Sequence, residues 1–349
     1  MDDVVFIDDE IHNTFKSTEI SHEDVFLNIT GASIGRSAIA EKSIVGGNVN
    51  QHVCIIRTKK NELYPYYLNA FLLSQKGQNL IDSYQAGGNR QGLNFEQIKS
   101  FKIPLPSYKE QTAIANLLST WDRAIQTTTQ LIAQKEQRKK WLMQQLLTGK
   151  KRLKEFNGEW KEILFGDFAE IVMGQSPEGS TYNNTCNGIA LINGPTEFTE
   201  KYPIKVQWTT SPTKICKEGD ILLCVRGSST GRLNIANEKY CIGRGIAAIR
   251  AKKNSDHSFL EFLVENVVNK ILSLTAGSTF PNIDSKSLRS IEVSLPHFPE
   301  QTAIASVLQA ADKEIQLLKA KADQLKQQKK GLMQQLLTGK KRLNYDLND

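Results

Sequence analysis

The chain contains one module twice. The hexapeptide Glu110–Ala115, EQTAIA, returns as Glu300–Ala305, and the dodecapeptide Leu142–Leu153, LMQQLLTGKKRL, returns unchanged as Leu332–Leu343. In both repeats the second copy follows the first after the same number of residues. A tandem module with a long helix at each end predicts a pseudo-two-fold molecule, which suits a ligand with two separated patches. Double-stranded DNA is such a ligand.

Composition limits the classes of protein that the chain can belong to. With 349 residues, 40% of them hydrophobic and 23% charged, it is long enough for two globular domains and is not of the disordered type. The net charge of +7 favours an anionic partner, although an ordinary lysine-rich surface explains it equally well. Five cysteines without a C-x-x-C pair indicate reduced thiols in a cytoplasmic protein. We expect neither a signal peptide nor a membrane span.

Two long helices are predicted, over residues 107–148 and 299–338. The first begins with an S-x-x-E capping box, Ser107 to Glu110, and is followed by Gly149. The second has Pro299 in its first turn and Gly339 after its end. At about 1.5 Å per residue, each would be roughly 60 Å long.

Apolar residues in both helices recur at alternating steps of three and four, which is the pattern of a coiled-coil seam. Lys135 and Lys139 weaken the first seam and Lys329 interrupts the second. We expect the two helices to pair with each other; packing inside one globule and a homodimeric coiled coil are the alternatives. The predicted seam residues are Ile114, Leu118, Trp121, Ile125, Ile132, Ile304, Leu308, Ile315, Leu318 and Leu325.

The remaining sequence predicts an α+β fold in both modules. Short β-rich runs such as Ile221–Val225 and Ile246–Ile249 are separated by Gly, Asn, Ser and Pro, and a helix is expected over 258–273. Residues 24–106 repeat only the latter half of this pattern, so the first module lacks its front part. The predicted domains are a partial first domain (1–106), a helix and linker (107–158), a complete second domain (159–296) and a helix and tail (297–349).

No catalytic motif is present. The sequence has no phosphate-binding loop, no H-E-x-x-H, no G-x-S-x-G and no dinucleotide-binding turn, and its histidines are scattered. Asp24 and Asp220 precede matching strands, where a turn-forming role explains them better than catalysis. We therefore expect neither a catalytic nor a metal site in this chain.

Several loops that contain glycine also carry residue types that recognise DNA bases. Arg226–Arg232 and Gly243–Gly245 are the main examples. Arginine grips guanine with two hydrogen bonds, Asn and Gln grip adenine, and Ser and Thr anchor phosphates. Ordinary turn chemistry is the alternative for each loop taken alone.

At this point the chain resembles the specificity subunits of type I restriction-modification enzymes. The resemblance lies in Glu218–Ser228, in Tyr240–Arg250, and in the stretch from Pro296 through EQTAIA to Gly339, and it covers nearly the whole chain. It implies two target recognition domains, each reading one half of a bipartite DNA site, held apart by the paired helices as an antiparallel coiled coil.

The resemblance also implies partners and cofactors. The chain would carry no catalysis itself and would recruit two modification subunits, which use S-adenosylmethionine, and restriction subunits, which use ATP and Mg²⁺. The residues expected to contact DNA are Gln175, Ser176, Tyr182, Asn193, Arg226, Ser228, Arg232 and Arg244 in the second module, and Thr30, Ser33, Arg36 and Arg90 in the first.

The first module departs from the family pattern. Nothing before Asp24 resembles Phe156–Asp167, with which family members begin a recognition domain. A truncated or rearranged specificity subunit that reads one half-site is therefore an alternative, and so is a coiled-coil adaptor that binds no DNA. A stand-alone nuclease or methyltransferase with unfamiliar motifs is the rival from the enzyme class.

Overall fold

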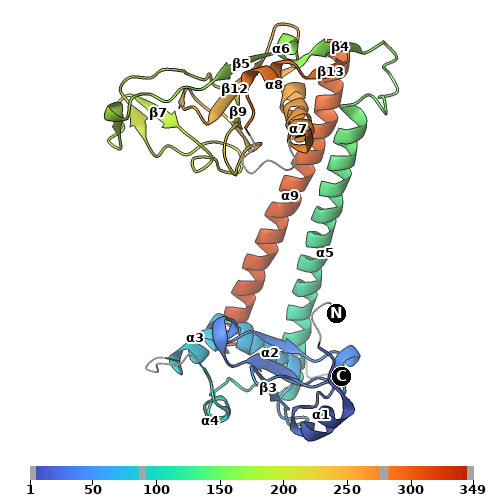
Figure 1. Ribbon diagram of the computed structural model, residues 1–349. Coiled ribbons are helices and arrows are strands. Elements are labelled where there is room, and N and C mark those ends of the chain that lie inside the picture. Colours follow the sequence, from blue (N-terminus) through green and yellow to red (C-terminus); the bar gives the residue numbers. More distant parts are fainter. Residues whose placement is uncertain (1–4, 86–91, 275–281, 344–349) are drawn as a thin grey trace. The chain divides into compact units, whose positions relative to one another are not determined.

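The computed structural model describes residues 5–85, 92–274 and 282–343 (Figure 1). The chain forms two compact units, Met1–Ile132 with Leu317–Asp349, and Ala133–Gln316. Each unit contains one α+β module and a segment of each long helix. The two units divide both long helices, after Ile132 and after Gln316, and so do not follow the predicted domain boundaries. These boundaries stay a prediction.

The long helices are α5 (Tyr108–Leu146) and α9 (Phe298–Leu336), within two residues of the predicted bounds. Ser107 accepts a hydrogen bond from the amide of Glu110, as a cap should, at 3.3 Å. The Glu110 carboxylate binds Arg342 instead of completing the predicted capping box. Gly149 and Gly339 end the helices with φ of +68° and +72°, a left-handed conformation that favours glycine.

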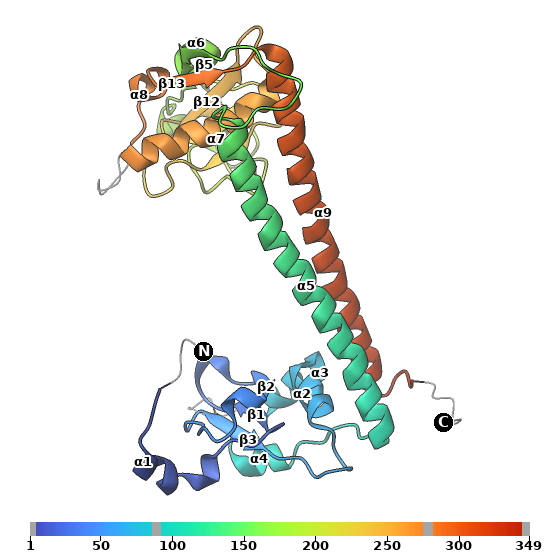
Figure 2. The same ribbon diagram turned by 90° about the vertical axis from the view of Figure 1, so that its right-hand side faces the viewer.

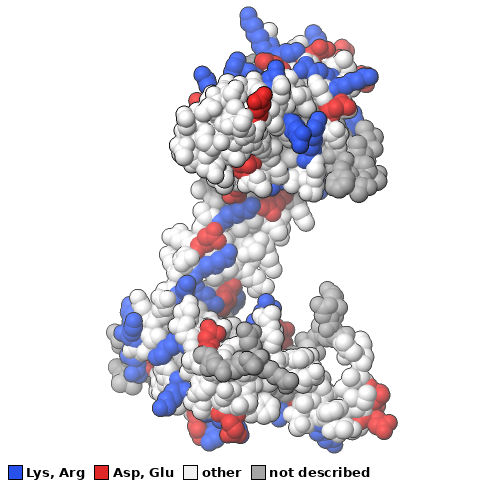
Figure 3. Space-filling model, turned by 60° about the vertical axis from the view of Figure 1, so that its left-hand side comes forward, with Lys and Arg blue, Asp and Glu red and all other residues white. Residues whose placement is uncertain are grey.

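Within each unit the segments of α5 and α9 lie side by side and antiparallel (Figures 1 and 2). In each unit two ion pairs define the direction, since the partner's residue number falls as the number along α5 rises. The pairs are Glu110–Arg342 and Asp122–Lys329 in the first unit, and Lys135–Glu314 and Lys139–Asp312 in the second. Acidic and basic side chains are accordingly mixed along the paired helices (Figure 3).

The predicted seam positions are the covered positions of these helices. Ile114, Leu118, Ile304, Leu308 and Ile315 are buried, and the other five are half-buried. The three lysines expected to weaken or interrupt the seam are partly covered, and their effect on its strength stays a prediction. The side chains of Lys135, Lys139 and Lys329 are only 21–22% exposed, because their stems lie along the seam while their ammonium groups reach a carboxylate of the other helix.

The first module is built on a three-stranded antiparallel sheet in the order β2-β1-β3. Val25 and Leu27 of the central strand face a buried cluster, whereas Phe26, between them, is half-buried. The elements are α1 (Asp9–Thr14), η1 (Lys16–Thr18), β1 (Val25–Asn28), η2 (Gly31–Ser33), β2 (Ser37–Ile39), η3 (Lys42–Ile44), β3 (Val53–Ile56), α2 (Pro65–Leu73), α3 (Gln75–Ser83) and α4 (Phe95–Lys99).

Helix α2 attaches this module to the long helices. Tyr67 and Phe71 are fully buried in a cluster with Ile114 and Leu118 of α5 and with Leu336 and Leu337 at the end of α9. The first module therefore packs on residues of both long helices and of the turn after α9.

The second module contains two four-stranded sheets and a strand pair, ordered β10-β9-β12-β5, β11-β7-β8-β6 and β13-β4. The elements are β4 (Lys161–Leu164), α6 (Phe165–Phe168), β5 (Ala169–Met173), η4 (Gly179–Thr181), β6 (Tyr182–Asn183), β7 (Ile189–Ile192), β8 (Trp208–Thr209), β9 (Ile221–Cys224), β10 (Leu233–Ile235), β11 (Cys241–Ile242), β12 (Ile246–Ala251), α7 (His257–Leu274), α8 (Ser285–Arg289) and β13 (Glu292–Leu295).

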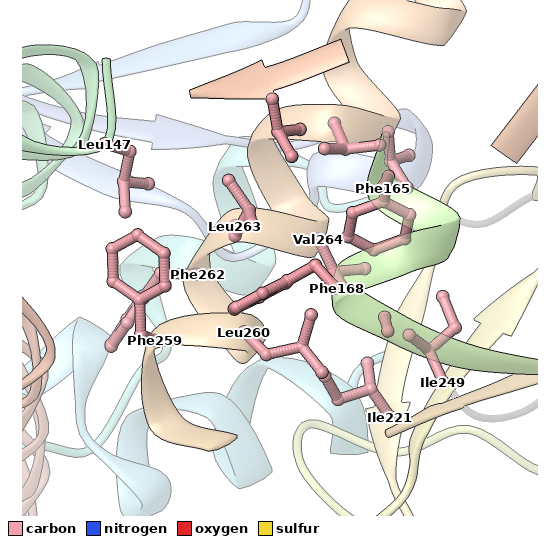
Figure 4. Packing of buried hydrophobic residues seen from close by; sticks show 14 of the residues in the cluster. Leu147, Phe165, Phe168, Ile221, Ile249, Phe259, Leu260, Phe262, Leu263 and Val264 are labelled. Atoms are coloured by element: carbon pink, nitrogen blue, oxygen red, sulfur yellow. The ribbon is translucent and has the colours of Figure 1, made fainter. Parts of the chain in front are cut away.

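The first of these sheets is covered on both faces, which explains why β9 is apolar throughout. Ile221 and Leu223 point into a cluster with the residues of α7, among them Phe259 and Leu263 (Figure 4). Leu222 and Cys224, which alternate with them, point into a second cluster with residues of the other sheet. Strand β1 of the first module reads VFLN instead of ILLC, and the first module has no counterpart of the second sheet among its described residues.

Candidate nucleic-acid interface

An open hollow of about 740 Å³ lies on the second module. Its lining includes five of the residues predicted to contact DNA, which are distant in sequence. They are Ser176, Tyr182, Asn193, Arg226 and Arg244, and Gly227 and Gly245 complete the lining.

Close backbone contacts bring the loops of the hollow together. The amide of Gly174, just after β5, donates to the Ile246 carbonyl, and that of Gly243 donates to the Ile192 carbonyl. A Cβ at Gly174 would lie 2.2 Å from the carbonyl oxygen of Gly243, so only glycine fits there. A Cβ at Gly243 would likewise lie 2.2 Å from Oδ1 of Asn193. The two glycines thus let the loops that carry Ser176, Asn193 and Arg244 approach one another closely.

Two arginines supply the positive charge of the hollow. Arg226 follows β9, where the Val225 amide donates to the Gly245 carbonyl at 2.9 Å, and Arg244 lies in the facing turn. Both side chains are exposed. Among the described residues, neither guanidinium has a hydrogen-bond or ion-pair partner, so their donors are available to an external ligand.

The neutral residues of the hollow are positioned by hydrogen bonds. The hydroxyl of Ser176 accepts from the Arg244 amide at 3.2 Å, and the hydroxyl of Tyr182 donates to the Pro177 carbonyl at 3.2 Å. The Asn193 amide lies 3.4 Å from Gln207 Oε1. The hollow thus combines guanidinium donors, an amide, a hydroxyl and a half-buried aromatic ring, which are groups that contact phosphates and base edges.

Three other predicted residues of this module do not line the hollow. The guanidinium of Arg232 donates to the carbonyls of Pro195 at 3.2 Å and Phe198 at 3.4 Å, so it braces that loop. Gln175 is exposed, and its carbonyl accepts from Thr213. Ser228 is exposed in the turn between β9 and β10. Their DNA contacts stay predictions.

In the first module the predicted residues lie in turns after β1. Thr30 Oγ1 is hydrogen-bonded to Nδ1 of His52, and the Ser33 hydroxyl accepts from the Asn28 amide at 2.8 Å. Arg36 is exposed. Arg90 lies outside the described residues. Sequence reasoning missed His52, because the turn that carries it shares no residue identity with Gly243–Gly245 of the second module.

Two cysteine thiols lie in the core of the second module. Cys216 and Cys224 are buried in the cluster between the two sheets. Burial raises the pKa of Cys216 to about 12 and also raises that of Cys224, so their thiolates are disfavoured. No group of His, Cys, Asp and Glu that could hold a metal ion occurs among the described residues. None of the described helices is long and apolar enough to cross a membrane.

Comparison with known proteins places this geometry in a family. The family model described as type I restriction modification DNA specificity domain matches residues 6–137 and 157–327. The chain therefore belongs to this family, the DNA specificity subunits of type I restriction-modification systems.

Two relatives come from Methanocaldococcus jannaschii. The protein named as the type I restriction enzyme MjaX specificity subunit is 36% identical over 324 residues, covering 89% of this chain and 76% of the relative. The type I restriction enzyme MjaVIII specificity subunit is 25% identical over 370 residues, covering 95% and 83%.

Solved structures share the fold. A chain from a study of complex assembly and conformational transition of the type I R-M system is 24% identical with a TM-score of 0.67, covering 91% of this chain and 82% of that one. The HsdS subunit from Thermoanaerobacter tengcongensis is 24% identical with a TM-score of 0.56, covering 92% and 82%. The S subunit from M. genitalium is 16% identical with a TM-score of 0.59, covering 92% and 84%.

Proposed function

We propose that this specificity subunit reads a bipartite DNA site, with one half assigned to each module, and that it performs no reaction itself. The observation that carries the proposal is the hollow in which Arg226 and Arg244 lie exposed without a partner among the described residues. Two unpaired guanidinium groups beside Asn193 and Ser176 suit a guanine edge or a phosphate.

The paired helices are proposed to set the number of unread base pairs between the two halves. Support comes from their equal length, 39 residues each, and from their matched seams. A helix of that length extends roughly 60 Å. Changing the helix length by whole turns would then change the gap.

Two modification subunits are the proposed direct partners, together with restriction subunits. Leu142–Leu153 and Leu332–Leu343 are identical also at exposed positions, such as Gln144 with Gln334 and Lys150 with Lys340, which the fold does not require to match. Two identical surfaces suit two copies of one partner. S-adenosylmethionine, ATP and Mg²⁺ would be bound by the partners, and the complex would act on DNA in the cytoplasm.

Substitution of the hollow's arginines tests the proposal. In complex with modification subunits, Arg226→Ala and Arg244→Ala should each weaken binding to the recognised duplex by about 1–3 kcal/mol if they contact bases. The control is Arg138→Ala, an exposed arginine on α5. Affinity equal to that of the control in both variants would refute the proposed contacts.

The rival functions give different results in two simple assays. A stand-alone nuclease or methyltransferase would modify plasmid when the purified chain is mixed with Mg²⁺ and a methyl donor, whereas a specificity subunit alone should not. A coiled-coil adaptor would leave the migration of DNA unchanged in the presence of modification subunits. A subunit that reads DNA should retard it.

A further inference from the structure

The turn Asn50–His52 of the first module holds the same place as Gly243–Gly245 of the second. Three pairs of backbone hydrogen bonds establish the match. Ile29 donates to the His52 carbonyl as Val225 donates to that of Gly245, both at 2.9 Å. Val53 donates to the Asn50 carbonyl as Ile246 donates to that of Gly243. Leu93 donates to the Ile29 carbonyl as Ile283 donates to that of Val225.

This match assigns a first-module residue to each arginine of the hollow. The isolated bridge Thr30–Gly92 corresponds to the bridge Arg226–Asn282, so Thr30 takes the place of Arg226. Gln51 takes the place of Arg244, because it precedes His52 as Arg244 precedes Gly245. The first module, whose described residues include no counterpart of the second sheet, therefore presents a hydroxyl and an amide where the second module presents two guanidinium groups.

The side chains at these positions form one exposed polar group. Thr30 is hydrogen-bonded to Nδ1 of His52, and the Gln51 amide lies 3.4 Å from Nε2 of the same ring. The Asn50 side chain accepts from the His52 amide at 3.0 Å, which fixes the turn. His52 and Gln51 are exposed, so a ligand can reach both.

Arg36, in the turns after β1, is a further cation of the first module. Its counterpart Arg232 is occupied by the carbonyls of Pro195 and Phe198, and the described part of the first module has no loop corresponding to 195–198. Arg36 is exposed and has no partner among the described residues. It is thus available for a phosphate, while the uncharged donors and acceptors of Gln51 suit an adenine edge.

We propose that Gln51 and His52, positioned by Thr30, determine the base preference of the first module, so that this shortened module reads its own half-site. The inference rests on the proposed function and adds the residues that read the second half of the DNA. It requires no part of the sheet β11-β7-β8-β6.

The test is selection of bound sequences by the full chain in complex with modification subunits. The probe is a duplex library with two randomised blocks separated by a gap of variable length. The unmodified complex should select two half-sites. Gln51→Ala and His52→Ala should each relax one or two positions of one half-site by roughly 5- to 150-fold, and leave the other half-site and the gap unchanged.

Matched variants separate the possible failures. Arg244→Ala should relax the opposite half-site, and Gln126→Ala, an exposed glutamine on α5, should relax neither. Two unchanged half-sites in both Gln51→Ala and His52→Ala would overturn the inference and leave the proposed function intact. An unmodified complex that selects a single half-site or no sequence would instead refute the proposed function, in which each module reads one half-site.

Discussion

Two crossed ion pairs hold the ends of the long helices. Glu110 and Glu300 lie in the first turns of α5 and α9, are 3% and 2% exposed, and bind Arg342 and Arg152 beyond the end of the other helix. A carboxylate is favoured near a helix N-terminus. Because each repeat supplies one glutamate and one arginine, the duplicated sequence makes the same contact twice.

Arg152 provides a test of what such a pair contributes. Its side chain is 27% exposed and binds Glu300 through two nitrogens. Arg152→Ala would leave a buried carboxylate without its partner and should lower the free energy of unfolding by about 1–3 kcal/mol, measured by denaturant titration. Arg138→Ala, on the exposed surface of α5, should change it by no more than about 0.5 kcal/mol. Equal effects would contradict the assigned contact.

The stability of the folded chain should depend on pH through the ionisation of Glu110. Its hydrogen bond to Arg342 lowers the pKa of Glu110 below the ordinary value of 4.5. The stabilisation is therefore present above the ordinary pKa and is lost as the pH falls through the lower pKa of the folded chain. Melting temperatures between about pH 6 and pH 3 should fall less steeply in Glu110→Gln than in the unmodified chain. The exposed Glu62→Gln should retain the full pH dependence.

At the scale of elements, the long helices could be predicted because their signals are local and repeated. The seam, the proline at the start of α9 and the two terminal glycines each act within a few residues. The short strands β6, β8 and β11 could not be predicted, since two residues each carry too little pattern. Their pairing depends on contacts far along the chain.

The candidate nucleic-acid interface, like the fold, could be predicted from the sequence only in part. Local sequence identified Arg226 and Arg244 as candidates, and the fold brings them to one hollow. It did not show that Arg232 is occupied by the carbonyls of a distant loop. Local sequence also did not show that the turn with Gln51 and His52 lies next to Thr30, because their contact follows from the register of the paired strands.

The contribution of the cluster at the end of α9 to stability can be measured with two leucines of this helix. Leu336 is 3% exposed in the cluster with Tyr67 and Phe71, whereas Leu317 is 60% exposed. Leu336→Ala should lower the free energy of unfolding by about 2–5 kcal/mol through lost burial and a cavity. Leu317→Ala should change it by about 0.5 kcal/mol or less. Denaturant titration of both variants would contradict the assigned packing if the losses were equal.

At the scale of the whole molecule, the first unit combines residues from both ends of the chain. Deletion of residues 317–349 would remove Leu336 and Leu337 from the cluster around Tyr67, while the second unit, Ala133–Gln316, would keep all its residues. Amide exchange should then become fast over residues 25–83 and stay slow in β9 and β12. Leu317→Ala in the full chain, at an exposed position of α9, should leave both patterns unchanged. Slow exchange throughout the first module of the shorter chain would contradict this view.

The cluster around Tyr67 also sets an order of events during synthesis. The first module cannot complete its packing until α9 has been made, whereas Ala133–Gln316 can fold while translation continues. A nascent chain that stalls before residue 317 would expose the apolar face of α2 to chaperones and proteases. The first module, although it is synthesised before the second, is thus the later of the two to mature.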